Sequence, residues 1–150
     1  MMKNLEKAIG VEELEVQTNN VKVEYFGYQG HLCVPCNFHL TTVVSNENKS
    51  IMISTVGNYE KPSCLRKETD YTRYEKIGCN RYFETFVGET RLNNGFIEMD
   101  VSELIETQVY VLDKENPTFE EILNSEKEAD LGHKLMVEKY IRILRNRNDN

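Results

Sequence analysis

Residues 38–56 read Phe-His-Leu-Thr-Thr-Val-Val-Ser-Asn-Glu-Asn-Lys-Ser-Ile-Met-Ile-Ser-Thr-Val, and the pattern of this stretch is that of two paired strands. Two runs within it, 38–45 and 51–56, are rich in β-branched residues and suit pleated strands. The residues between them, 46–49, are polar and typical of a turn. The stretch therefore predicts a β-hairpin.

Alternation of apolar and polar residues predicts further strands on both sides of this hairpin. It appears at residues 21–25, at 82–87 and again at 106–112. Asn94-Gly95, followed by a strand-like run at 96–99, is the strongest tight-hairpin signal in the chain. These runs together predict an antiparallel sheet.

The last third of the chain changes to a helical period. Thr118-Phe-Glu-Glu121 and Ser125-Glu-Lys-Glu128 each match a capping box, the pattern that starts a helix. After the second box we expect one amphipathic helix to about residue 146, with residues 148–150 as a frayed tail. Its apolar face contains Ala129, His133, Met136, Val137, Tyr140, Ile141 and Leu144.

Length and pattern together predict the fold class. A chain of 150 residues fits one domain, 1–150. An antiparallel sheet needs one face covered, and the amphipathic helix can cover it. We therefore expect an α+β fold in which an antiparallel β-sheet of hairpins packs against a long C-terminal helix.

Composition excludes some classes of function. The net charge of -7 disfavours general nucleic-acid binding, which needs a positive field. No apolar run approaches the roughly 18 residues of a membrane span. The N-terminus lacks the apolar stretch of a signal peptide, so we expect a cytoplasmic protein without membrane partners. A homo-oligomer is compatible with this composition.

The segment 57–81 is the best candidate for a ligand site. It is irregular in pattern, and arginine and tyrosine are interleaved along it. Arginine binds phosphate or carboxylate, and tyrosine offers a stacking face. The competing interpretation is a solvated loop whose charges compensate one another. The predicted ligand-binding residues are Tyr59, Arg66, Tyr71, Arg73 and Arg81.

Four cysteines raise the alternative of a zinc site. Cys33-Val-Pro-Cys36 has the two-residue gap of a zinc knuckle, and Cys64 and Cys79 would complete four ligands. The second pair is spaced much more widely than the first, and free cysteines are often simply buried. We therefore expect no cofactor, with zinc as the alternative.

Catalysis is not expected from the sequence. Nucleophilic catalysis requires Ser or Cys paired with His, and no local signature of such a site is present. His133 lies on the apolar face of the predicted helix, where a packed histidine with one hydrogen bond is the expected role. His39 and His133 are the residues on which an enzyme alternative, a hydrolase or nuclease, depends.

Three short segments, taken in order, resemble a group of small proteins carried by tailed bacteriophages and prophages. They are Ile53-Ser-Thr-Val56, Phe83-Glu-Thr-Phe-Val87 and Ala129-Asp-Leu-Gly-His133, the last followed by Met136-Val137. The likeness covers about residues 51–141, and Ser125 and Glu128 match the cap of that group's final helix. The group has no established common activity, so the resemblance implies a phage origin and little chemistry.

The shared residues are interpreted as determinants of the fold. Gly132 would allow a close approach of helix and sheet, and Glu84-Thr85 would pair across to a neighbouring strand. We therefore hypothesise a non-enzymatic phage accessory protein in the cytoplasm of the infected bacterium. It would bind a host factor or sequester a small anionic, nucleotide-like ligand, as in anti-defence. A virion-associated structural protein and a zinc-binding interaction module are the alternatives.

Overall fold

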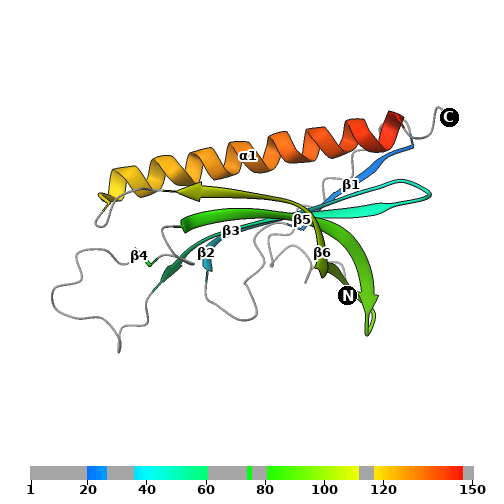
Figure 1. Ribbon diagram of the computed structural model, residues 1–150, viewed down its shortest axis with the longest axis horizontal. Helices are drawn as coiled ribbons and strands as arrows, with labels where there is room; N and C mark the ends of the chain where they lie inside the picture. Colours follow the sequence, from blue (N-terminus) through cyan, green and yellow to red (C-terminus); the bar gives the residue numbers. More distant parts are fainter. Residues whose placement is uncertain (1–19, 27–35, 61–73, 76–80, 112–116, 147–150) are drawn as a thin grey trace, which may run out of the picture.

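The computed structural model describes residues 20–26, 36–60, 74–75, 81–111 and 117–146. In this part of the chain one long helix lies along one face of an antiparallel sheet (Figure 1), which confirms the predicted α+β class. The sheet has the order β1-β2-β3-β5-β6, and the short β4 pairs with the end of β3. The elements are β1 (Lys22–Tyr25), β2 (Cys36–Ser45), β3 (Ser50–Glu60), β4 (Tyr74–Glu75), β5 (Arg81–Asn93), β6 (Phe96–Val111) and α1 (Phe119–Asn146).

The β2–β3 hairpin forms as predicted, around the turn that begins at Asn46. The Asn46 side chain accepts hydrogen bonds from the backbone N–H of Asn48 at 3.0 Å and of Lys49 at 2.8 Å. Its amide also donates to the Leu144 carbonyl at 3.1 Å, which ties the turn to the end of α1. β3 continues to Glu60, beyond the expected end at Val56, because β4 pairs with Tyr59 and Glu60.

The β5–β6 hairpin turns at Asn94-Gly95, as predicted. Both residues have positive φ, 50° and 83°, the conformation that this tight turn requires. The strands predicted at 96–99 and 106–112 are one strand, β6, because pairing with β5 continues through register shifts between them. Figure 1 shows the resulting hairpin bending away from α1, as bulged strands do.

Helix α1 begins at the first predicted capping box. The Thr118 N–H donates to Glu121 Oε2 at 2.7 Å, and the Glu121 N–H donates to Thr118 Oγ1 at 3.3 Å. The expected start at Ser125 is wrong: Ser125 is buried inside α1. No helix-breaking residue lies between the two boxes, and Ile122 is buried against the sheet, so the helix begins at the earlier one.

Cross-strand pairing aligns side chains in rows beneath α1. Phe38, Gly57, Phe83 and Tyr110 form one row. The Phe38 and Phe83 rings meet edge to face, with centroids 5.6 Å apart. Gly57 makes room for them, because a Cβ there would lie 2.0 Å from Phe83 Cδ1. A second, aliphatic cluster lies under the C-terminal half of α1 and contains Val21, Val44, Ile51, Ile53, Val87, Met136, Tyr140 and Leu144.

Candidate functional site

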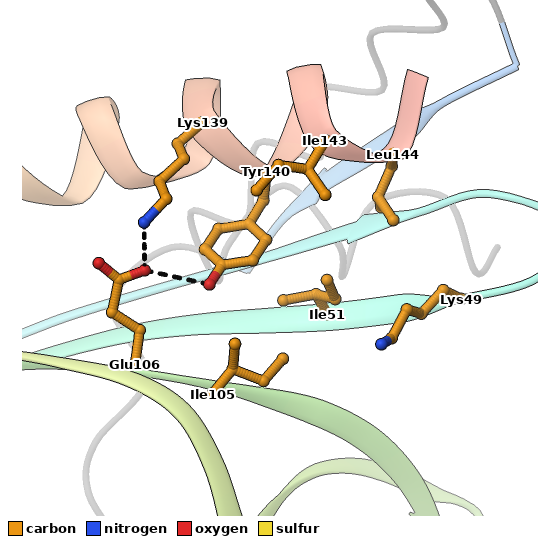
Figure 2. Close-up of a pocket in the computed structure, with 8 residues that line it drawn as sticks. All are labelled: Lys49, Ile51, Ile105, Glu106, Lys139, Tyr140, Ile143 and Leu144. Carbon is orange, nitrogen blue, oxygen red and sulfur yellow. Dashed lines mark hydrogen bonds and ion pairs between the residues drawn. The ribbon is translucent and has the colours of Figure 1, made fainter. Parts of the chain in front are cut away.

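A cleft opens between β6 and the C-terminal half of α1, and we call it the α1–β6 cleft. Its volume is about 340 Å³, at the small end of the range of ligand pockets, roughly 300–1,000 Å³. Figure 2 shows an aliphatic floor with charged groups at its margins. The lining residues are Lys49, Ile51, Ile105, Glu106, Lys139, Tyr140, Ile143 and Leu144.

A β-bulge brings two consecutive residues of β6 into the cleft. Glu106 pairs with Val87, whereas Leu104 pairs with the next residue, Gly88, so Ile105 is an extra residue in β6. Neighbouring side chains of a regular strand point to opposite faces. Ile105 and Glu106 both line the cleft because the bulge interrupts that alternation.

Glu106 is the centre of the polar margin of the cleft. Its Oε2 accepts hydrogen bonds from Lys139 Nζ at 2.5 Å and from the Tyr140 hydroxyl at 3.1 Å. The hydrogen bond from Lys139 holds the pKa of Glu106 below its usual value. Burial, followed by the hydrogen bond to Glu106, raises the pKa of Tyr140 to about 12. At neutral pH the carboxylate is therefore ionised and the phenol neutral, and neither is poised for acid–base catalysis.

The two ammonium groups of the cleft are both matched by carboxylates. Lys139 pairs with Glu106, and Lys49 pairs with Glu89. The cleft consequently has no surplus positive charge with which to attract an anion. Its chemistry suits an uncharged, aliphatic group entering from the β6 side.

β6 exposes further aliphatic side chains on both faces of the sheet: Ile105 lines the cleft, whereas Val109, which pairs with Glu84, lies on the face away from α1. We call four of the exposed aliphatic residues of β6, Val101, Leu104, Ile105 and Val109, the β6 edge surface; Val101 is 69% exposed. Leu135, one helical turn before Lys139, lies on the same side of α1 and is 53% exposed. Large aliphatic groups exposed along an edge strand indicate a site suited to interaction.

His133 is buried in a chain of hydroxyl groups between α1 and the sheet. Its Nε2 is 2.8 Å from Thr42 Oγ1, and its Nδ1 is 2.8 Å from Thr55 Oγ1. Thr55 in turn meets Thr85 Oγ1 at 2.7 Å. Burial lowers the pKa of His133 to about 4. His133 is a packed residue, as predicted, although with two hydrogen bonds instead of one.

His39 lies on the opposite face of the sheet and also meets hydroxyl groups. Its Nε2 is 3.1 Å from Ser54 Oγ and 3.1 Å from Thr41 Oγ1. Two hydroxyls share one ring nitrogen, so Ser54 has no exclusive base. A nucleophile would also need free backbone N–H groups aimed at an oxyanion. Along residues 51–56 the backbone of β3 is engaged in pairing with β2 on one side and β5 on the other. We therefore interpret the hydrogen bonds of His39 as structural and not as part of a catalytic pair.

The residues predicted to bind a ligand fall largely outside the described part of the chain. Arg66, Tyr71 and Arg73 lie outside it, and the structure places only the backbone of Tyr59 and Arg81. Tyr59 pairs with Glu75 in β4, and Arg81 pairs with Val111 in β6. Their role in binding stays a prediction.

The cysteines of the zinc alternative also lie largely outside the described part of the chain. Cys33, Cys64 and Cys79 lie outside the described residues, and Cys36 begins β2 without a described side chain. Among the side chains that are described, no group of three or more His, Cys, Asp or Glu residues could hold a metal ion. The zinc site stays an untested alternative.

Sequence reasoning missed the α1–β6 cleft. Its residues come from β3, β6, α1 and the turn before β3, which are far apart in the chain. One local signal was present: Leu104-Ile105 places two aliphatic residues side by side soon after the alternating run 98–102. Such a break in alternation is where a bulge is expected.

Comparisons of this chain with protein-family models, with curated proteins and with solved structures found no match. No relative therefore suggests a ligand or a reaction for the cleft. Among helices in the described part of the chain, none combines the length and the apolar character that crossing a bilayer requires.

Proposed function

We propose that this protein acts by binding another protein, without catalysis, in the cytoplasm of a bacterium infected by a phage. The single observation that carries the proposal is the β6 edge surface, where aliphatic side chains are exposed along a strand at the end of the sheet. The phage origin rests on the sequence resemblance, and it makes a host factor the expected partner. An anti-defence role follows from that expectation and is part of the proposal.

The charges of the α1–β6 cleft favour a protein partner over a small anion at this place. Each lysine there already has a carboxylate partner, so a nucleotide phosphate would have to compete for it. An aliphatic side chain needs no such exchange and gains from burial at roughly 25 cal/mol per Å². The version in which a small anionic ligand is sequestered rests on Tyr59, Arg66, Tyr71, Arg73 and Arg81.

Site-specific photo-cross-linking in bacteria that produce the protein tests this proposal. A photoreactive amino acid at position 101 or at position 109 should capture one discrete bacterial protein. The same group at Leu123, an exposed aliphatic residue near the start of α1, serves as the matched control and should not capture it.

The captured protein, identified and purified, should bind the unmodified chain in a defined ratio. The double substitution Val101→Asp, Val109→Asp should weaken that binding at least tenfold, because it places charge on the apolar contact. Absence of a discrete adduct from both β6 positions, or affinity unchanged by the double substitution, would contradict the proposal.

A further inference from the structure

The outer edge of β6 is open along the part that borders the cleft. β6 is the last strand of the sheet, and from Leu104 to Val111 its described partner is β5 alone. The side away from β5 presents backbone N–H and C=O groups that the described residues do not pair. Such an edge is a template for one more strand.

The charges on β6 indicate which strand it would accept. The strand carries Glu98, Asp100, Glu103 and Glu106 and no basic residue. The first two form ion pairs with Arg91 of β5, and Glu106 pairs with Lys139. Glu103 is exposed and makes no ion pair with any described residue. An incoming strand therefore meets an acidic edge on which one carboxylate, that of Glu103, is not compensated by any described residue.

The same charges argue against a second copy of this chain as the occupant. Antiparallel pairing of β6 with itself would join two acidic strands, neither of which supplies a base. Like charges that face each other across a strand pair are destabilising. A basic partner strand would instead be drawn to the edge, in agreement with the net charge of -7 of the whole chain.

We infer that the β6 edge accepts an extended partner segment in which aliphatic residues alternate with Lys or Arg. One aliphatic side chain of that segment enters the α1–β6 cleft beside Ile105, and a basic side chain faces Glu103. This inference rests on the proposed function and adds the chemistry of the partner.

Two synthetic peptides test it. Both are blocked, fluorescently labelled nonapeptides; one alternates Val with Lys and the other alternates Val with Glu. In fluorescence anisotropy with the full chain, the lysine peptide should bind at least tenfold more tightly than the glutamate peptide. A lysine peptide N-methylated at every residue cannot donate backbone hydrogen bonds from either edge and should lose most of that affinity.

A charge reversal makes the test specific to β6. Glu103→Lys should weaken the lysine peptide about tenfold and strengthen the glutamate peptide. Glu47→Lys, an equal charge change in the exposed β2–β3 turn, is the matched control and should alter neither. Equal affinity for the two peptides, an effect of Glu47→Lys as large as that of Glu103→Lys, or a concentration-dependent dimer that Val101→Asp abolishes would overturn the inference.

Failure of the inference and failure of the proposed function give different results. If neither peptide binds while position 109 still cross-links to one bacterial protein, the partner chemistry is wrong and the proposed function stands. If the cross-link is also absent, both are wrong.

Discussion

The buried contact of α1 with the sheet and the exposed outer side of β6 use similar residue types for opposite purposes. Beneath α1, Val44, Ile53 and Val87 are removed from water almost completely. A short distance away, Val101 and Val109 remain in contact with it. Both groups lie on strands of the same sheet, so strand propensity does not distinguish them. The helix covers the first group and not the second.

The comparison also separates fold from function. The residues that carry the phage resemblance, Thr55, Thr85, Gly132 and His133, meet in the buried contact. The β6 edge surface contains none of them. The residues on which the resemblance rests therefore belong to the buried helix–sheet contact and not to the surface that a partner would touch. The resemblance therefore says more about the fold than about the partner.

Acidification should have the largest effect of all, by lowering the stability of the buried contact between α1 and the sheet. His133 has a pKa of about 4 in the folded protein against 6.5 when exposed, with burial as the main cause, Asp130 opposing it, and His39 and Lys134 adding to it. The contribution of neutral His133 to the free energy of unfolding is therefore fully present above pH 6.5. It is lost as the pH falls toward 4, because the unfolded chain takes up a proton that the folded protein excludes. The total loss is roughly 3 kcal/mol, of which about 2 kcal/mol appears by pH 5.

Urea unfolding at pH 7.5 and at pH 5 measures this loss, with His133→Gln as the control. The variant should be less stable at pH 7.5 and should lose much less on acidification. An equal loss in both proteins would show that other groups cause the pH dependence.

α1 lies so close to the sheet at Gly132 that an added methyl group there should be destabilising. A Cβ at Gly132 would lie 1.8 Å from the Tyr110 hydroxyl oxygen, and Tyr110 is buried. Gly132→Ala should therefore lower the free energy of unfolding by about 2 kcal/mol through overpacking. Thermal and urea unfolding give the value. In a Tyr110→Phe background the same change should cost less, and an equal cost in both backgrounds would contradict the contact.

Loss of one hydroxyl should weaken the buried hydrogen-bond chain by about 1.5 kcal/mol. Thr55→Val keeps the shape of the side chain but leaves Thr85 and His133 each with one partner fewer. The exposed Thr107 of β6 offers the matched control, and Thr107→Val should leave the free energy of unfolding nearly unchanged. Similar effects at the two positions would remove the distinction between the buried contact and the edge.

The smallest expected effect is at the β6 edge itself. Val101→Ala should change the free energy of unfolding by less than about 0.5 kcal/mol, because the side chain is already in water. The same substitution at Val44, which is fully buried, should cost about 2 kcal/mol. Urea unfolding of both variants measures the contrast. A large loss at Val101 would mean that this residue serves stability and not recognition.

Most of the described elements could be predicted from local sequence. The alternation at 38–45 and 51–56, the turn at Asn94-Gly95 and the box at Thr118 each form the predicted structure. Each depends on residues within a few positions of one another, so the physical cause is contained in the segment. The role of Gly132 was predictable for the same reason, since a glycine on the apolar face of a helix indicates close packing.

Predictions that required a choice between two local signals were less accurate. Two capping boxes were present, and burial of Ile122 against the sheet is the reason that α1 begins at the first. Two short strands were expected where β6 is continuous, because pairing with β5 carries the strand across its irregular stretch. In both cases contacts between distant segments outweighed the local pattern.

Local sequence was enough to predict the two hairpin turns, most of the strand positions and the apolar face of the helix, because each follows from periodicity or turn chemistry within a short segment. The folded arrangement was needed to show that Thr42, Thr55, Thr85 and His133 form one chain of hydrogen bonds, and that Ile105 and Glu106 share the α1–β6 cleft. Those arrangements depend on the register between strands and on a bulge, which are set by the packing of residues far apart in the chain.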